Sequence, residues 1–256
     1  MKRRSICSLM LLWMLTSSLS VCMAMPVDSL MLKGNEAYLK NQYQEALAAY
    51  LQIDSVGFRS ADLYYNMGNS YFKMGMKSEA LLWYERALRL NPSNEDIQHN
   101  IAFVNQHLID KIETLPQLFI VAWYNQISGS LTSNNWAIIS LCAMILLAAM
   151  LVLFFVSTRR PIRKCAVSLF FVAVFIAVLS IFFAHREKNR YVERPEAIIM
   201  EKVVSAKSSP SENSKELFVI HEGLKVVITD QIGSFYEIKL PNGEKGWVVG
   251  ENIAVI

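Results

Sequence analysis

The sequence predicts a multidomain membrane protein with an all-α helical repeat domain, two transmembrane α-helices and a small all-β domain. Three observations predict this fold class. A pattern recurs at a 34-residue offset within residues 27–94, two long uncharged apolar runs lie within residues 136–184, and strand-like alternation begins after residue 195. The chain is 53% hydrophobic and 18% charged, whereas water-soluble domains carry about 25% charged residues. A single soluble domain is therefore excluded.

Residues 1–24 have the features of a signal peptide. Basic residues at positions 2–4 precede an apolar stretch, residues 6–15, that is too short to cross a bilayer. Residues 22–24 (Cys-Met-Ala) place small side chains at a cleavage site. Two alternatives stay open: an uncleaved anchor, or lipidation at Cys22, because residues 19–22 (Leu-Ser-Val-Cys) resemble a bacterial lipobox. All three would export residue 25 onward.

Two runs are long enough to span a membrane. Trp136–Ser157 has 22 residues and Cys165–Ala184 has 20, and neither contains a charged side chain. About 20 apolar residues cross a hydrocarbon core of ~30 Å. Residues 158–164 between them carry four positive charges, which predicts a cytoplasmic loop. We therefore expect a multi-pass inner-membrane protein whose two flanking domains face the periplasm.

The segments beside these spans carry different signals. Residues 115–135 are uncharged and rich in apolar and aromatic side chains. They predict either a juxtamembrane helix that lies in the membrane interface or a loop with apolar anchors. Residues 185–194 are interpreted as a linker to the last domain.

The 34-residue offset aligns Gly34-Asn35 with Gly68-Asn69 and Tyr50 with Tyr84. A repeat of this length resembles the tetratricopeptide repeat (TPR), a pair of helices. We expect a TPR domain over residues 25–114, with repeats at 27–60 and 61–94 and a capping helix at 95–113. The cap is indicated by apolar residues at helical spacing: Ile97, Ile101, Val104, Leu108 and Ile112.

The resemblance to TPR domains implies a concave groove in which asparagine amides bind an extended peptide and aromatic rings hold its side chains. The implied groove residues are Asn35, Tyr38, Tyr65, Asn66, Asn69, Phe72 and His99. The family's carboxylate-binding variant has a lysine where this sequence has Met31, so capture of a chain terminus is not expected. The alternative for the asparagines is a solvated or locally bonded role.

Short β-rich runs follow residue 195. They are Glu196–Val203, Glu216–His221, Lys225–Asp230, Phe235–Leu240, Gly246–Val249 and Ile253–Ile256. With a Ser/Pro-rich loop, a hairpin signal at residues 241–243 and a Gly-Trp-Val motif at 246–248, they resemble the bacterial SH3 domain. We expect a small SH3-like barrel over residues 195–256. The resemblance implies an aromatic groove of Phe235, Tyr236 and Trp247; core packing of Phe235 and Trp247 is the alternative.

No pattern typical of an active site is present. The four cysteines and four histidines lack metal-binding spacing, and phosphate-binding and hydrolase motifs are absent. Glu79 and Glu85 are interpreted as solvated positions on a helix face. Residues 25–113 and 187–256 both carry net negative charge, so no nucleic-acid partner is expected. We predict a non-enzyme without a cofactor or metal.

The order of leader, TPR domain, aromatic juxtamembrane segment, two spans and SH3-like domain resembles the BatE family of the Bacteroides aerotolerance operons. Residues 65–72 (Tyr-Asn-Met-Gly-Asn-Ser-Tyr-Phe) and 83–92 (Trp-Tyr-Glu-Arg-Ala-Leu-Arg-Leu-Asn-Pro) carry the resemblance. It implies a non-enzymatic envelope adaptor in the lipid bilayer, with partners that include other Bat proteins with von Willebrand A domains. The alternative is a cell-wall contact protein whose SH3 domain binds peptidoglycan and whose TPR domain recruits a wall enzyme.

Overall fold

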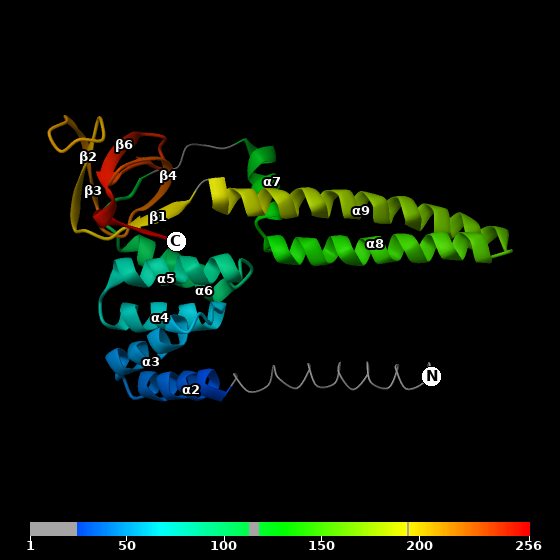
Figure 1. Cartoon of the computed structure of the whole chain (residues 1–256), viewed down its shortest axis with the longest axis horizontal. Helices are drawn as coiled ribbons and strands as arrows, with labels where there is room; N and C mark the ends of the chain where they lie inside the picture. The colour runs from blue at the N-terminus through cyan, green and yellow to red at the C-terminus, as the bar shows by residue number, and fades with distance from the viewer. Residues whose placement is uncertain (1–24, 113–117, 194) are drawn as a thin grey trace, which may run out of the picture.

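The computed structural model describes residues 25–112, 118–193 and 195–256, so the predicted signal peptide and Cys22 lie outside the described residues. Three parts are visible in Figure 1: a stack of short helices, a long helical hairpin and a β-sheet. The stack contains α2 (Met25–Leu39), α3 (Tyr43–Ser55), α4 (Ala61–Lys73), α5 (Lys77–Leu90) and α6 (Glu95–Gln106). The sheet lies at one end of this stack, beside α5 and α6.

The helices of the stack pack in pairs, α2 with α3 and α4 with α5, and a glycine permits each close approach. A Cβ atom on Gly34 would lie 2.4 Å from Cε1 of Tyr50, and one on Gly68 would lie 2.5 Å from Cδ1 of Tyr84. Only a hydrogen fits between these backbones and rings. The 34-residue offset in the sequence is thus repeated in three dimensions.

Helix α6 begins in the same way as α4. The side chain of Ser60 accepts a hydrogen bond from the backbone N–H of Leu63 at 3.1 Å. Asn94, 34 residues later, accepts one from the N–H of Ile97 at 3.0 Å. Each side chain satisfies an N–H group that the first turn of a helix leaves without an intrahelical partner. Helix α6 therefore takes the place of the first helix of a further repeat.

Helix α6 ends at Gln106, although the apolar pattern predicted a helix to residue 113. Leu108 packs on the core of the helical stack and against Gly223 of the β domain, and Ile112 packs on the core of the sheet. The apolar residues that suggested a continuing helix therefore make contacts with a distant part of the chain.

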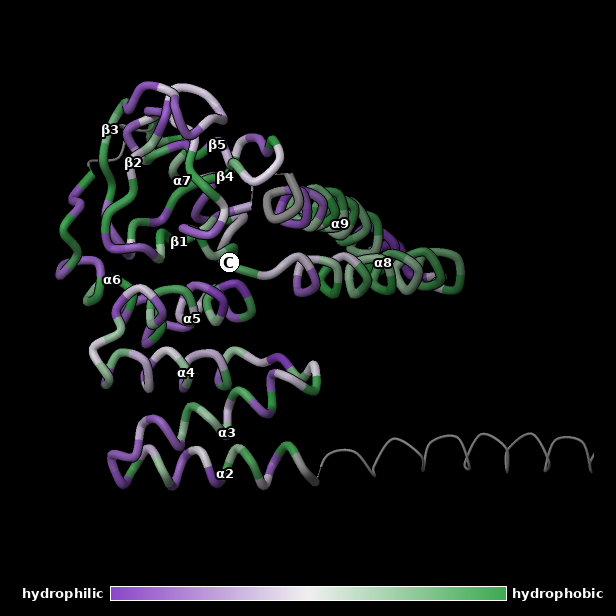
Figure 2. The backbone as a smooth tube through the Cα atoms, turned by 60° about the vertical axis from the view of Figure 1, so that its left-hand side comes forward, coloured by the Kyte–Doolittle hydropathy of each residue, from purple (hydrophilic) through white to green (hydrophobic). Residues whose placement is uncertain are grey.

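Two long helices, α8 (Ser133–Val156) and α9 (Arg160–Glu193), pack side by side as a hairpin. Both are long and apolar enough to cross a membrane by length and composition, and Figure 2 shows their hydrophobic character. Large apolar side chains stay exposed along both, including Phe155 (79%) and Phe171 (65%). Helix α9 continues past the predicted span and through residues 185–193, the stretch interpreted as a linker.

A short helix, α7 (Phe119–Ser128), contacts α9 near the end of the hairpin. The guanidinium of Arg186 lies 4.2 Å from the ring centroid of Tyr124, and it donates hydrogen bonds to Asn125 Oδ1 at 2.5 Å and to the hydroxyl of Ser128. The indole N–H of Trp136 donates to the Ser128 carbonyl at 3.0 Å. These bonds hold α7 on the hairpin.

The β domain is a seven-stranded antiparallel sheet with the strand order β3-β2-β6-β5-β4-β1-β7. Its strands are β1 (Glu196–Ile199), β2 (Val203–Lys207), β3 (Glu216–His221), β4 (Lys225–Ile232), β5 (Phe235–Lys239), β6 (Lys245–Val249) and β7 (Ile253–Val255). The edge strands β3 and β7 do not pair with each other within the described residues, so the sheet is open and not the closed barrel that the sequence predicted.

The predicted strand Glu196–Val203 ends at Ile199, and a second strand, β2, begins at Val203 and extends to Lys207. The chain turns at residues 200–202, so that β1 pairs with β4 and β7 while β2 pairs with β3 and β6. The turn therefore places β1 and β2 at different positions in the sheet. A continuous run of β-forming residues does not reveal such a turn.

The helical stack and the sheet share a packed interface. Ile198 of β1 and Ile256 are buried in the core of the stack. The ammonium group of Lys225 lies 2.8 Å from the carboxylate of Glu85 on α5 and 2.9 Å from that of Glu196. Glu85 is only 7% exposed. The interpretation of Glu85 as a solvated residue is wrong, because its partner comes from the β domain.

Three further side chains join the two parts. Arg86 of α5 donates a hydrogen bond to the backbone carbonyl of Val255 at 2.8 Å, and Arg89 donates to the carbonyl of Ile256. Asp110, after α6, accepts bonds from the backbone N–H of His221 at 2.6 Å and from its imidazole at 2.8 Å. The stack and the sheet therefore form one continuous body on the side of α5 and α6.

Candidate protein-binding groove

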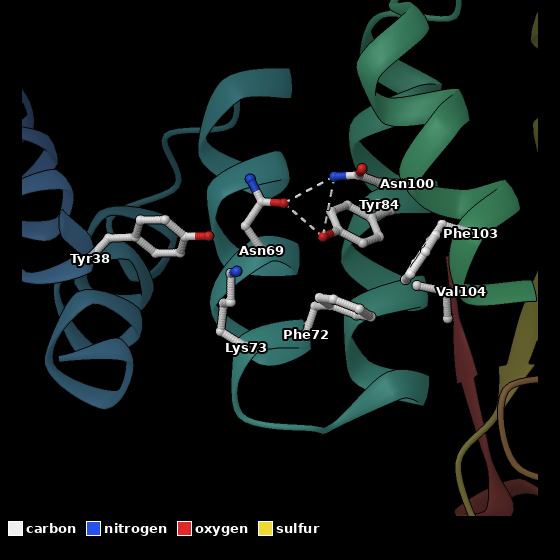
Figure 3. Close-up of a pocket in the computed structure, with 8 residues that line it drawn as sticks. All are labelled: Tyr38, Asn69, Phe72, Lys73, Tyr84, Asn100, Phe103 and Val104. Atoms are coloured by element: carbon white, nitrogen blue, oxygen red, sulfur yellow. Dashed lines mark hydrogen bonds between the residues drawn. The ribbon is translucent and has the colours of Figure 1, made fainter. Parts of the chain in front are cut away.

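A pocket of about 210 Å³ opens between helices α2, α4 and α6 of the stack (Figure 3). Helix α2 contributes one residue, α4 contributes three, α6 contributes three, and α5 supplies the tyrosine between them. The lining residues are Tyr38, Asn69, Phe72, Lys73, Tyr84, Asn100, Phe103 and Val104. The pocket is smaller than the roughly 300–1,000 Å³ of a typical small-molecule site.

A hydrogen-bond network organises the polar side of the pocket. The hydroxyl of Tyr84 donates to Asn69 Oδ1 at 2.7 Å, and the Asn100 amide donates to the same oxygen at 3.1 Å. Asn100 also donates to the hydroxyl of Tyr65 at 3.2 Å. The dashed lines in Figure 3 join Asn69, Asn100 and Tyr84. The two amide side chains are therefore held in fixed orientations.

The preceding repeat contains a corresponding network. Tyr50 donates its hydroxyl hydrogen to Asn35 Oδ1 at 2.8 Å, and Asn66 donates to that oxygen at 3.3 Å. The 34-residue offset relates Tyr50 to Tyr84, Asn35 to Asn69 and Asn66 to Asn100. The chain therefore builds one polar arrangement twice, and the described pocket opens beside the second copy.

Burial keeps the tyrosines of these networks neutral. It raises the pKa of Tyr50 to about 12, with a smaller contribution from Tyr38. Burial also raises the pKa of Tyr84 above its ordinary value of 10.0. A neutral phenol keeps the proton that it donates to the asparagine oxygen. The networks are therefore intact at neutral pH.

The other side of the pocket is apolar and aromatic. The rings of Phe72 and Phe103 meet edge to face with their centroids 5.8 Å apart, and Val104 lies beside them. The side chain of Phe103 is 43% exposed although it is large and apolar. An exposed aromatic pair at a concave surface is typical of a site that binds another side chain.

The predicted groove residues fall into three groups. Tyr38, Asn69 and Phe72 line the pocket. Asn35, Tyr65 and Asn66 lie outside its lining but take part in the hydrogen-bond networks. His99 is exposed and does not line the pocket.

Sequence reasoning did not place Lys73, Asn100 and Phe103 in the groove, although all three line the pocket. The repeat offset contained the signal for Asn100, because residue 66 plus one repeat is residue 100. The same offset maps Tyr65 onto His99, which the resemblance to TPR domains implied as a groove residue. Helix α6 instead presents Asn100 and Phe103 to the pocket.

The aromatic residues predicted on the β domain lie on two faces of the sheet. Alternation along β5 places Tyr236 with the buried Ile238, and Tyr236 packs on the sheet core. Phe235 and Trp247 belong to the opposite face, where Phe235 pairs with Val249 across β5 and β6. Both are partly exposed. The three rings therefore do not form one continuous surface.

The described residues contain no group of three or more His, Cys, Asp or Glu side chains that could hold a metal ion. The groove instead presents fixed amides, aromatic rings and one ammonium group.

Comparison with known protein families agrees with this geometry. Residues 61–94 match the tetratricopeptide repeat family. The match covers α4 and α5, the helix pair that supplies Asn69, Phe72, Lys73 and Tyr84 to the pocket. No curated protein matches the chain. The chain therefore contains a TPR repeat within a larger helical stack, and TPR repeats are typically non-catalytic protein-interaction modules.

Proposed function

We propose that this protein is a non-enzymatic, membrane-anchored adaptor that binds protein partners through the groove of its helical stack. The observation that carries the proposal is the pocket between α2, α4 and α6, with its fixed asparagine amides and exposed Phe103. Rigid polar groups beside an aromatic wall suit an extended peptide better than a small molecule.

The exposed apolar surface of the helical hairpin supports the proposal that the protein is anchored in a membrane. Helices α8 and α9 expose most of their large apolar side chains, which a bilayer would cover. The charged turn between them carries Arg159, Arg160, Arg163 and Lys164. By the positive-inside rule this turn is cytoplasmic, and both flanking domains lie in the periplasm.

Helix α7 fits an interfacial position beside the hairpin. It exposes Phe119 (79%), Ile120 (61%) and Trp123 (63%), while its other side is held by Arg186. Aromatic side chains favour the headgroup region of a bilayer. We propose that this face of α7 rests in the outer boundary of the membrane.

The proposal extends to a complex with other Bat proteins, including those with von Willebrand A domains. Its support is the resemblance in domain order and in residues 65–72 and 83–92. A second function, contact with peptidoglycan through an SH3-like domain, is favoured by the partly exposed Phe235 and Trp247. Retention of the full-length protein on purified peptidoglycan, with loss in Trp247→Ala, would favour this second function.

Two phenylalanines with the same 43% exposure provide a matched test of the adaptor proposal. Phe103 lines the pocket, whereas Phe58 lies between α3 and α4 and does not. Tagged protein is crosslinked in native membranes, purified and analysed by quantitative mass spectrometry. Phe103→Glu should deplete the specific partners and Phe58→Glu should retain them. Equal recovery with both variants would contradict the groove assignment.

A further inference from the structure

The pocket presents one fixed hydrogen-bond donor and one fixed acceptor, on either side of the hydrogen bond between Asn100 and Asn69. Asn69 uses its Oδ1 atom, and Asn100 its Nδ2 atom, in the network with Tyr84. This leaves the Asn69 Nδ2 donor and the Asn100 Oδ1 acceptor without a hydrogen-bond partner among the described side chains (Figure 3). The free donor and the free acceptor lie at opposite ends of this amide pair, so they match a carbonyl and an N–H group at two places along an extended backbone, whereas a carboxylate requires donors only.

One end of the pocket is apolar. Phe72, Phe103 and Val104 form this end, and the pocket volume of about 210 Å³ is too small for a typical cofactor. Burial of an apolar side chain against two aromatic rings is favourable. The structure therefore provides a socket for a single apolar residue beside the amide pair.

Lys73 supplies the charge of the pocket. It carries the one charged side chain among the eight lining residues. Within the described residues, no carboxylate lies within ion-pair distance of it. An exposed ammonium group at the mouth of a binding site favours a ligand with a negative charge at that place.

From these three features we propose that the pocket binds an internal segment of an extended peptide in which a large apolar residue lies next to an acidic one. The apolar side chain enters the Phe72–Phe103 end, and the acidic side chain pairs with Lys73. One backbone carbonyl of the segment bonds to Asn69 Nδ2, and a separate backbone N–H bonds to Asn100 Oδ1. This inference rests on the proposed function and specifies the ligand of the same groove.

Capped hexapeptides test the proposal with the full-length protein in detergent micelles. The reference probe is acetyl-Gly-Ser-Phe-Glu-Ser-Gly-amide, and its dissociation constant is measured by calorimetry. Replacing Phe with Ala in the peptide should weaken binding about tenfold or more. Replacing Glu with Gln should weaken it about threefold, the contribution of a partly exposed ion pair. A free carboxyl terminus should add nothing.

Protein variants assign each preference to its residue. Lys73→Gln should abolish the preference for Glu over Gln, whereas Lys77→Gln, at an exposed position outside the pocket, should keep it. Phe103→Ala should abolish the preference for Phe over Ala, and Phe58→Ala should keep it. Unchanged melting temperatures verify that the variants fold.

Three results would overturn this inference: equal binding of the Glu and Gln peptides, a Glu preference that survives Lys73→Gln, or no binding of any peptide at millimolar concentration. None of them would by itself remove the adaptor function. That function fails only if Phe103→Glu and Phe58→Glu retain the same partners in native membranes.

Discussion

Tyr84 donates its hydroxyl hydrogen bond to Asn69 Oδ1 at 2.7 Å, and this bond links the second helix of the repeat to the wall of the pocket. Tyr50 and Asn35 form the equivalent bond at 2.8 Å in the preceding helix pair. The tyrosines that pack each helix pair therefore also fix a side chain of the groove. The tyrosine that fills the space beside Gly68 also fixes the asparagine that faces the groove.

Removal of this hydroxyl should loosen the groove. Tyr84→Phe leaves Asn69 with one donor fewer, and we expect it to lower the stability of the helical stack by about 1 kcal/mol. Tyr43→Phe is the control, because Tyr43 makes the same kind of bond to Asn41 at an exposed site. Thermal unfolding monitored by tryptophan fluorescence measures both. Equal losses of stability in the two variants would show that the buried bond contributes no more stability than the exposed one.

Close packing at Gly68 predicts a larger effect. An added Cβ would lie 2.5 Å from the Tyr84 ring, so Gly68→Ala should destabilise the stack by about 1–3 kcal/mol through overpacking. Asn105→Ala adds an alanine to an exposed helical position and should be nearly neutral. The same thermal unfolding measurement applies. A melting temperature for Gly68→Ala at or above that of the native protein would contradict the packing.

The repeat could be predicted from the sequence because its signals are local. The glycine–tyrosine offset, the N-cap at Asn94 and the proline after α5 each act within one or two helices. The end of α6 and the pairing of Glu85 could not be predicted in this way. They depend on Gly223 and Lys225, more than 100 residues away, and no local pattern encodes which distant residue fills a helix face.

The same reasoning explains the outcome for the groove and the sheet. The prediction placed Tyr38, Asn69 and Phe72 at the pocket but took His99 in place of Asn100. A shift of one residue turns a helix by about 100°, so His99 does not line the pocket that Asn100 lines. In the sheet, the hairpin signals gave the strands after Glu216. The turn at residues 200–202 lacks a glycine or proline signal, so the predicted strand ran through it to Val203, and β2 beyond that residue was not predicted.

Loss of Lys225 should weaken the contact between the stack and the sheet. Lys225→Met leaves the buried carboxylate of Glu85 without its ammonium partner, at a cost of about 1.5–3 kcal/mol for a charged hydrogen bond. Lys245→Met is the control, because Lys245 pairs with Glu237 on the exposed face. Limited proteolysis at neutral pH should cleave the Lys225 variant faster. Equal cleavage rates would argue against an energetic link.

This contact should also respond to alkaline pH. Burial acts to lower the pKa of Lys225, but the carboxylates of Glu85 and Glu196 outweigh it and hold the pKa above 10.5. A raised pKa gives stability that is present below the unfolded pKa and lost as the pH rises through the folded one. The difference in melting temperature between the native protein and Lys225→Met should therefore shrink above pH 10.5. A constant difference would exclude this linkage.

The proposed topology can be examined with single cysteines in a background that lacks all four native cysteines, Cys7, Cys22, Cys142 and Cys165. In intact cells, an impermeant maleimide should label Asn213→Cys, in the β domain, and spare Pro161→Cys, in the basic turn. Both positions are exposed in the structure, so protection reports the membrane barrier and not burial. Labelling at position 161 with protection at position 213 would reverse the orientation.

Site-specific photocrosslinking tests the role of the groove most directly. A photoreactive phenylalanine analogue replaces Phe103 or, as the matched control, Phe58, and intact cells are irradiated before purification. The account predicts a discrete covalent adduct with a partner protein from position 103 and none from position 58. Adducts from both positions in equal yield, or from position 58 alone, would contradict the assignment of partner binding to the pocket between α2, α4 and α6.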